Sequence, residues 1–195
     1  MVVGAIRGHE GRERGELLGR GEALRMTQSF FHEKSALFWV WLSAFVVALD
    51  QLTKWYVVGR FELYEILPMG TYLDLTRLHN EGAAFGLLAD AGGWQRWFFL
   101  VLAGEIALAI LWWLRSLPAR GHSWLAIGLA LILGGAVGNA YDRFMDGHVV
   151  DYLHFHWGEH FFPAFNVADI GITTGAIMLV IDALLSSRRS KAATG

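Results

Sequence analysis

The hydrophobic positions of this chain gather into four long stretches separated by more polar segments. Each stretch is about 20 residues long, the length that a helix needs to cross the hydrocarbon core of a membrane. Trp and Tyr residues lie near several of the ends, as they do in the aromatic belts of membrane proteins. The pattern therefore predicts four transmembrane helices, at residues 36–57, 94–114, 123–141 and 166–185.

The two longer connections, about 58–93 and 142–165, carry different patterns. In the first, "TYLDLTRLHN" (71–80) alternates apolar and polar residues and is rich in aromatic and β-branched side chains, which predicts one or two short strands. The following "EGAAFGLL" (81–88) is typical of a tight turn that leads into a re-entrant or interfacial piece. The second connection is rich in aromatic residues and His. We expect an all-α integral membrane protein of four transmembrane helices with a small β-containing cradle.

Composition supports this fold class and excludes several kinds of chemistry. The chain is 54% hydrophobic and 17% charged, with nine Trp and thirteen Phe, which is too apolar for a water-soluble domain of 195 residues. It contains no Cys, so disulfides, thiol catalysis and thiolate metal sites are excluded. The net charge of -2 gives no reason to expect a nucleic-acid partner.

Basic residues fall mainly on one side of the predicted helices. They include Arg12, Arg14, Arg20, Arg25 and Lys34 before the first helix, Arg115 and Arg120 between the second and third, and Arg188, Arg189 and Lys191 after the fourth. By the positive-inside rule, both termini are cytoplasmic and the two long loops, with the β-containing cradle, are extracytoplasmic.

The chain divides into three parts on this basis. Residues 1–35, rich in Gly, Arg and Glu, form a cytoplasmic tail that we expect to be mostly disordered. Residues 36–186 form the four-span domain, and residues 187–195 form a second cytoplasmic tail. The first apolar segment is of full span length and lacks a small-residue cleavage site, so a cleaved secretory signal is not expected.

Six polar residues gather at the outer membrane face, in or next to the ends of these helices and in the second long loop. They are Asp50, Asn139, Asp142, Asp151, Asn166 and Asp169. A charged Asp costs about 3 kcal/mol at mid-bilayer on the insertion scale and less near the interface. Each group therefore needs a partner, and we expect a polar pocket between the helices, just below the outer surface.

Helical spacing strengthens this expectation. One face of the third helix carries Gly135, Asn139 and Asp142 or Arg143, and one face of the fourth carries Asn166, Asp169 and Thr173. Gly134 and Gly138 form a small-xxx-small pair, which allows close approach of another helix.

Two carboxylates brought together at such a depth cannot easily both ionise. Charge repulsion and desolvation raise one pKa, so that the pair shares a proton near neutral pH. Such a pair can draw a proton from water with one member and polarise a carbonyl with the other, which is aspartic-protease chemistry and needs no metal. Spacing alone leaves open which of Asp142, Asp151 and Asp169 form the pair.

Five motifs at these positions resemble those of the lipoprotein signal peptidase family (signal peptidase II). They are "DQLTK" (50–54), "NEGAAFG" (80–86), "GGAVGNAYDR" (134–143), "VVDY" (149–152) and "FPAFNVADI" (162–170). They occur in the order of the family, and the resemblance covers about residues 36–186.

The resemblance implies a role for each candidate residue. Asp151 and Asp169 match the catalytic pair. The matching site-lining or site-organising positions are Asp50, Lys54, Asn80, Gly135, Asn139, Asp142, Arg143 and Asn166. The implied activity is an intramembrane aspartic endopeptidase that cuts diacylglyceryl-modified prolipoproteins before the lipid-modified cysteine, with no cofactor and no metal. The implied setting is the bacterial inner membrane, with the site toward the extracytoplasmic face, and we expect a monomer among membrane lipid.

Structural interpretations stand beside these roles. Asp151 and Asp169 could belong to a polar network that holds the loop to the fourth helix. Asp50 and Lys54 are spaced for an intrahelical ion pair. Arg143 could pair with Asp142 or with lipid phosphate, and the two Asn residues could cap or bridge helices.

Two other features carry no predicted role. Glu105 lies mid-span, and we expect it to be buried, protonated or bonded to another helix. His154, His156 and His160 in "HFHWGEH" have a strand-like spacing rather than the HExxH zinc pattern, and we interpret them as loop or interfacial residues.

The competing function is a proton-coupled transporter with Asp50, Glu105, Asp151 and Asp169 as a relay. A relay usually steps across the whole membrane, whereas all of these except Glu105 lie at one face. No inverted repeat relates the two helix pairs, as it does in many transporter folds. A scaffold that only binds lipid-modified protein is a third hypothesis, which leaves the paired aspartates without a function.

Overall fold

The structure, a computed structural model, describes residues 35–82 and 92–194. The predicted N-terminal tail, up to residue 34, and most of the predicted turn "EGAAFGLL" lie outside the described residues.

Four helices of the described chain are long and apolar enough to cross a membrane, which confirms the predicted spans. The first consists of a short 3-10 helix, η1 (Ala36–Trp39), that continues into α2 (Val40–Val58). The others are α3 (Trp94–Ser116), α4 (Ser123–Met145) and α5 (Val167–Thr194), whose membrane-spanning part is Val167–Ser187.

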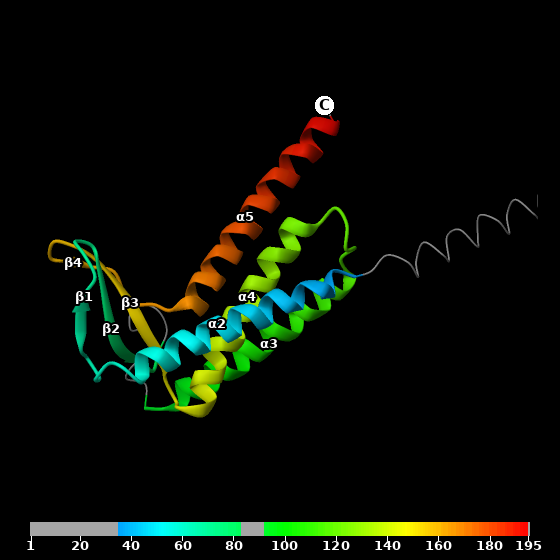
Figure 1. Cartoon of the computed structure of the whole chain (residues 1–195). Coiled ribbons are helices and arrows are strands. Elements are labelled where there is room, and N and C mark those ends of the chain that lie inside the picture. The colour runs from blue at the N-terminus through cyan, green and yellow to red at the C-terminus, as the bar shows by residue number, and fades with distance from the viewer. Residues whose placement is uncertain (1–34, 83–91, 195) are drawn as a thin grey trace, which may run out of the picture.

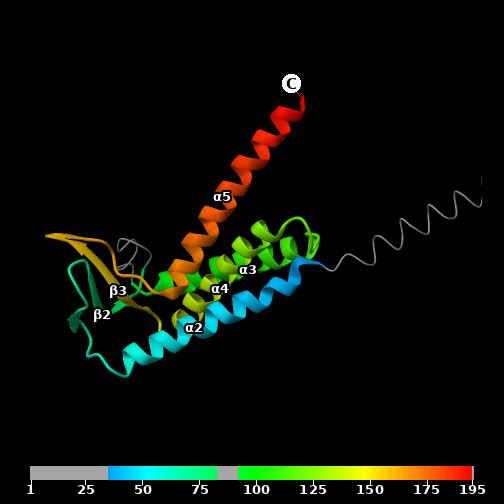
Figure 2. The ribbon, with the colours of Figure 1, turned by 45° about the horizontal axis from the view of Figure 1, so that its top comes forward.

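Helix α4 is the centre of the bundle, because it packs against α2, α3 and α5. More than half of its span, 56%, is buried, compared with 11% for α3. Both views show α5 diverging from the other three helices toward its C-terminal end, whereas its N-terminal end lies in the bundle beside the strands (Figures 1 and 2). The polar ends of α2, α4 and α5 therefore come together next to the sheet.

Three glycines of α4 permit this close packing. Gly134 and Gly138 face α2, where an added Cβ would lie 2.7 Å from the Val46 Cβ and 2.8 Å from an oxygen of Asp50. The predicted small-xxx-small contact is therefore confirmed, with α2 as the partner. Gly135 faces α5, where an added Cβ would collide with the backbone carbonyl of Ala168.

We expect Gly135→Ala to destabilise the folded protein by about 1–3 kcal/mol, the usual cost of overpacking. The added methyl group meets backbone, which cannot rotate away, so α4 and α5 must move apart. Thermal unfolding in detergent micelles measures the effect. Gly70→Ala is the control, because an added Cβ there meets nothing within 4 Å. Equal stability of the two variants would contradict this packing.

Four strands form a small antiparallel sheet at one end of the bundle, in the order β1-β2-β3-β4. They are β1 (Ile66–Pro68), β2 (Leu73–Asn80), β3 (Val149–Trp157) and β4 (His160–Phe161). The predicted strand content of 71–80 is confirmed by β2, and the sheet is the predicted β-containing cradle.

The expectation that Glu105 is buried is wrong, and within the described chain it bonds to no other helix. Glu105 is exposed on α3, and no hydrogen bond or ion pair joins it to another described residue. The apolar sequence around Glu105 reveals its depth in the membrane but not its side of the helix. Because α3 packs mainly against α4, most of its surface faces outward.

Candidate active site

Asp169 is held by the first turn of α5. Asn166 precedes the helix, and its side-chain Oδ1 accepts a hydrogen bond from the backbone N–H of Asp169, at 3.0 Å. In return, the Asp169 Oδ2 accepts one from the backbone N–H of Asn166, at 3.2 Å. This reciprocal pair has the geometry of a capping box. It fixes the Asp169 carboxylate at the positive end of the helix dipole, which stabilises a negative charge there.

Asp151 is placed by the pairing of β2 with β3. It lies opposite Leu78, and a bulge between Leu75 and Leu78 shifts the register of the two strands. Asn80, two residues beyond Leu78, is therefore the diagonal neighbour of Asp151 on the same face of the sheet. Its Nδ2 donates to the Asp151 Oδ2 at 3.0 Å.

Two asparagines connect the aspartates. The Asn166 Nδ2 donates to the Asp151 Oδ1, and the Asn139 Nδ2 donates to the Asp169 Oδ1, both at 2.8 Å. The Asn166 Nδ2 also lies 3.2 Å from the Asn139 Oδ1. Residues from β3, α4 and α5 thus form one continuous polar chain between the carboxylates.

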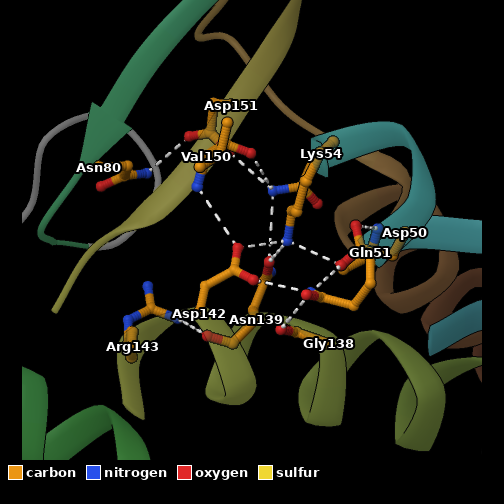
Figure 3. A network of polar contacts seen from close by, with 12 residues as sticks. Asp50, Gln51, Lys54, Asn80, Gly138, Asn139, Asp142, Arg143, Val150 and Asp151 are labelled. Atoms are coloured by element: carbon orange, nitrogen blue, oxygen red, sulfur yellow. Dashed lines mark hydrogen bonds and ion pairs between the residues drawn. The ribbon is translucent and has the colours of Figure 1, made fainter. Parts of the chain in front are cut away.

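A buried ionic cluster lies beside this chain (Figure 3). The Lys54 ammonium contacts the Asp50 Oδ2 at 2.8 Å, the Asp142 Oδ2 at 2.7 Å and the Asn139 Oδ1 at 3.0 Å. Lys54 is 3% exposed, Asp50 0% and Asp142 5%. The predicted Asp50–Lys54 ion pair is therefore confirmed, as the part within α2 of a cluster that also includes α4.

Every carboxylate oxygen of this cluster has a donor. The Asp50 Oδ1 accepts from the backbone N–H of Ala168 at 2.9 Å, so α2 helps to cap α5. The Asp142 Oδ1 accepts from the Gln51 Nε2 at 2.7 Å, and its Oδ2 lies 3.4 Å from the backbone N–H of Val150. The cluster therefore ties both helices and β3 to the start of α5.

Sequence reasoning missed Gln51. Its amide nitrogen reaches Asp50 at 3.2 Å, Asp142 at 2.7 Å and the carbonyl of Gly138 at 3.3 Å. The available signal was its place inside "DQLTK", next to Asp50.

Arg143 holds the edge of the site through backbone contacts. Its Nη2 donates to the carbonyl of Gly82 at 2.7 Å, its Nη1 lies 3.4 Å from the carbonyl of Asn139, and its guanidinium lies 4.8 Å from the centre of the Phe99 ring. Its buried Nε has no hydrogen-bond partner among the described residues.

The two aspartates line one cavity of about 820 Å³. Of the other predicted site residues, Asn80, Asn139 and Arg143 line it, whereas Asp50, Lys54, Gly135, Asp142 and Asn166 lie behind its wall. The rest of the wall is mostly apolar and comes from α3, α5 and the segment before α5. It includes Phe99, Leu102, Ile106, Phe162, Phe165, Ile170 and Ile172. The site therefore joins a small polar centre to a much larger apolar surface.

The environment of Asp151 favours its protonated form. Burial raises the pKa of Asp151 from 3.8 to about 7, and the negative charge of Asp169 adds to this increase. The hydrogen bonds from Asn80 and Asn166 act in the opposite direction and lower this pKa.

His79 lines the same cavity and stacks on His148, with 3.6 Å between ring centres. Burial, and after it the charge of His148, lower the pKa of His79.

The His residues of "HFHWGEH" lie away from this cavity, on β3 and β4. The His156 Nε2 is 3.4 Å from the Asp74 Oδ1, and the His154 ring stacks on Phe161. Within residues 35–82 and 92–194, no group of three or more His, Asp or Glu side chains is arranged to hold a metal ion.

The chain is similar to known proteins of one family. Residues 42–185 match the family model of signal peptidase (SPase) II. Lipoprotein signal peptidases of Pseudomonas putida and Pseudomonas aeruginosa are 47% and 45% identical to the chain, which covers 91% and 94% of their lengths, over 80% of its own in each case. A bacterial membrane enzyme solved by the in meso method is 27% identical, with a TM-score of 0.67 over 77% of this chain and 89% of its own.

Proposed function

Because this chain belongs to the signal peptidase II family, we propose that Asp151 and Asp169 are its catalytic residues. The chain is a membrane-embedded protease that removes the signal peptide from prolipoproteins. The observation that supports an aspartic mechanism is that two carboxylates from distant parts of the chain line one cavity and are connected through Asn139 and Asn166.

In the proposed reaction, Asp169 is the base and Asp151 the acid. Asp169 is half-buried at the start of α5, where the helix dipole stabilises its charge, and it takes a proton from the attacking water. Asp151, whose pKa of about 7 keeps it largely protonated below neutral pH, donates its proton to the carbonyl oxygen of the scissile bond. Water adds to the carbonyl carbon and forms a tetrahedral intermediate.

The intermediate then collapses with the reverse proton movements. Asp169 gives its proton to the departing amide nitrogen, the carbon–nitrogen bond breaks, and Asp151 recovers a proton from the hydroxyl group. The products are the carboxyl end of the signal peptide and a free amino group on the lipid-modified cysteine. No covalent enzyme intermediate and no cofactor take part.

The remaining cavity residues position the reacting groups. Asn80, Asn139 and Asn166 orient the two carboxylates, and Arg143, which lines the cavity, places a positive charge beside them. The buried cluster of Asp50, Lys54 and Asp142 keeps Asn139 in the orientation in which its Nδ2 faces Asp169, because Lys54 occupies its Oδ1.

The apolar wall fits a substrate that is already in the membrane. Both acyl chains of a diacylglyceryl group and the signal helix would enter sideways from the lipid and contact the α3 and α5 surfaces. By the positive-inside rule the sheet and the cavity face the extracytoplasmic side of a bacterial inner membrane, with both termini in the cytoplasm.

Cleavage of a defined substrate tests this function. The purified protein is incubated with a diacylglyceryl-modified prolipoprotein, and mass spectrometry identifies the bond that is cut. We expect one cut, before the lipid-modified cysteine, and none in the same prolipoprotein without the lipid. Binding of the lipidated substrate without cleavage would favour a scaffold. The comparisons give no support to a transporter.

The pH dependence of cleavage is a separate prediction. We expect kcat/KM to fall above about pH 7, because Asp151 then loses the proton that it must donate. Asn80→Ala should move this alkaline limb upward by about one pH unit, since it removes a hydrogen bond that favours the charged form of Asp151.

His79→Asn is the control for this profile. Because the pKa of His79 is lowered from 6.5, its titration falls on the acid side, and the variant should keep the alkaline limb. If the alkaline limb of the pH profile moves with His79→Asn and not with Asn80→Ala, the assignment of Asp151 as the acid is contradicted.

A further inference from the structure

Helix α3 carries a continuous exposed line of residues that we call the α3 seam. It consists of Trp94, Phe98, Val101, Glu105, Leu108 and Trp112, all of them exposed. Their spacing alternates between four and three residues, the heptad pattern of helices that pack pairwise with a left-handed crossing.

The seam faces away from the rest of the protein. At 100° per residue, it lies on the side of α3 opposite Ile110 and Leu114, which are buried in the core shared with α4. It also lies apart from Leu102 and Ile106, which line the cavity. Another helix could therefore cover the seam without filling the active site.

Glu105 is the exceptional residue of the seam. It lies at the midpoint of α3, eleven residues from Trp94 and from Ser116, which is about 16 Å of helix from either end. Its side chain is too short to reach an interface, and a carboxyl group in hydrocarbon is costly unless it is hydrogen-bonded. No described residue of the chain bonds to it.

We propose that the α3 seam is a dimer interface, in which Glu105 pairs with Glu105 of the partner subunit. Two copies inserted in the same orientation are related by a two-fold axis along the membrane normal, which makes the two α3 helices parallel and brings each central residue opposite itself. A protonated carboxyl group has both a donor and an acceptor. Two such groups therefore satisfy each other, and no second kind of protein is needed.

The proposed dimer departs from the monomer expected from the sequence. Small residues flank the central position, because Gly104 precedes Glu105 and Ala109 lies one turn after it. An added Cβ at Gly104 meets nothing within 4 Å in the single chain, so a neighbouring helix has room to approach closely. Polar groups in such a seam also fix the register of the two helices.

Cysteine cross-linking in liposomes tests the dimer. Since the chain has no Cys, Leu108→Cys introduces a single thiol into the seam, and Ile177→Cys, exposed at mid-span on α5, is the matched control. With a membrane-permeant oxidant at high lipid-to-protein ratio, we expect at least tenfold more disulfide-linked dimer from Leu108→Cys than from Ile177→Cys.

A second pair of variants tests the role of the carboxyl group. In the Leu108→Cys background, Glu105→Leu should reduce cross-linking to the Ile177→Cys level, whereas Glu105→Gln should retain it, because an amide is also both donor and acceptor. Cross-linking of Leu108→Cys no higher than the control would overturn the dimer. The dimer would be overturned by this result even if a cationic helix of another protein is found to bind the seam in native membranes. Full cross-linking with Glu105→Leu would overturn the role of Glu105.

Discussion

Asp169→Asn is expected to lower kcat for prolipoprotein cleavage by at least about a thousandfold, and Asp151→Asn by a similar factor. An amide at position 169 cannot take a proton from water, and an amide at position 151 cannot protonate the scissile carbonyl. KM should change much less, because the apolar wall that contacts the substrate is untouched. Steady-state cleavage of a lipidated prolipoprotein in detergent or liposomes measures both constants.

Asp74→Asn is the matched control for these variants. Asp74 is a buried carboxylate of the same sheet, paired with His156 and absent from the cavity wall, so its replacement should leave kcat within a few-fold of wild type. Thermal unfolding of each variant shows whether the fold is retained. Folded Asp151→Asn and Asp169→Asn proteins that still cleave at the wild-type rate would refute the catalytic pair.

Lys54→Met should destabilise the folded protein by about 3–5 kcal/mol, the usual cost of leaving buried charges without their partner. The Lys54 ammonium is the common contact of Asp50 and Asp142, which are both almost fully buried. Without it, two neighbouring carboxylates would repel each other between α2 and α4. Thermal or denaturant unfolding in micelles measures the loss.

Two comparisons separate this effect from a general loss of charge. Arg60→Met, an exposed cation just after the same helix, should change stability by less than about 0.5 kcal/mol. Replacing Asp50 and Asp142 by Asn together with Lys54→Met should restore part of the stability, because no unpaired charge then remains. A Lys54→Met protein as stable as Arg60→Met would contradict the buried cluster.

The spans and the local contacts of this protein could be predicted from sequence, because both depend on residues that are close along the chain. Apolar length gave the four helices, and the i, i+4 spacing gave the Asp50–Lys54 pair. The contact of Lys54 with Asp142 could not be predicted, since it depends on how closely Gly134 and Gly138 allow α2 to approach α4.

The register of the strands and the rotation of a helix about its own axis also could not be predicted from the sequence. Asn80 reaches Asp151 because of a bulge between Leu75 and Leu78, and no local pattern marks that bulge. The wrong expectation for Glu105 has a similar origin, because hydropathy places a residue in depth and tertiary packing decides which side of the helix faces outward. The family resemblance, rather than spacing, singled out Asp151 and Asp169 as the pair.

The most direct measurement of the central claim is the titration of Asp151 in the folded protein without substrate. Infrared difference spectra between wild type and Asp151→Asn isolate the band of its protonated carboxyl group. We expect a midpoint of about pH 7. In the Asp169→Asn background the midpoint should move to lower pH, because the negative charge that helps to raise this pKa is gone. An Asp151 already ionised well below pH 7 in the wild type, or a midpoint that ignores Asp169→Asn, would show that the two carboxylates do not share a proton.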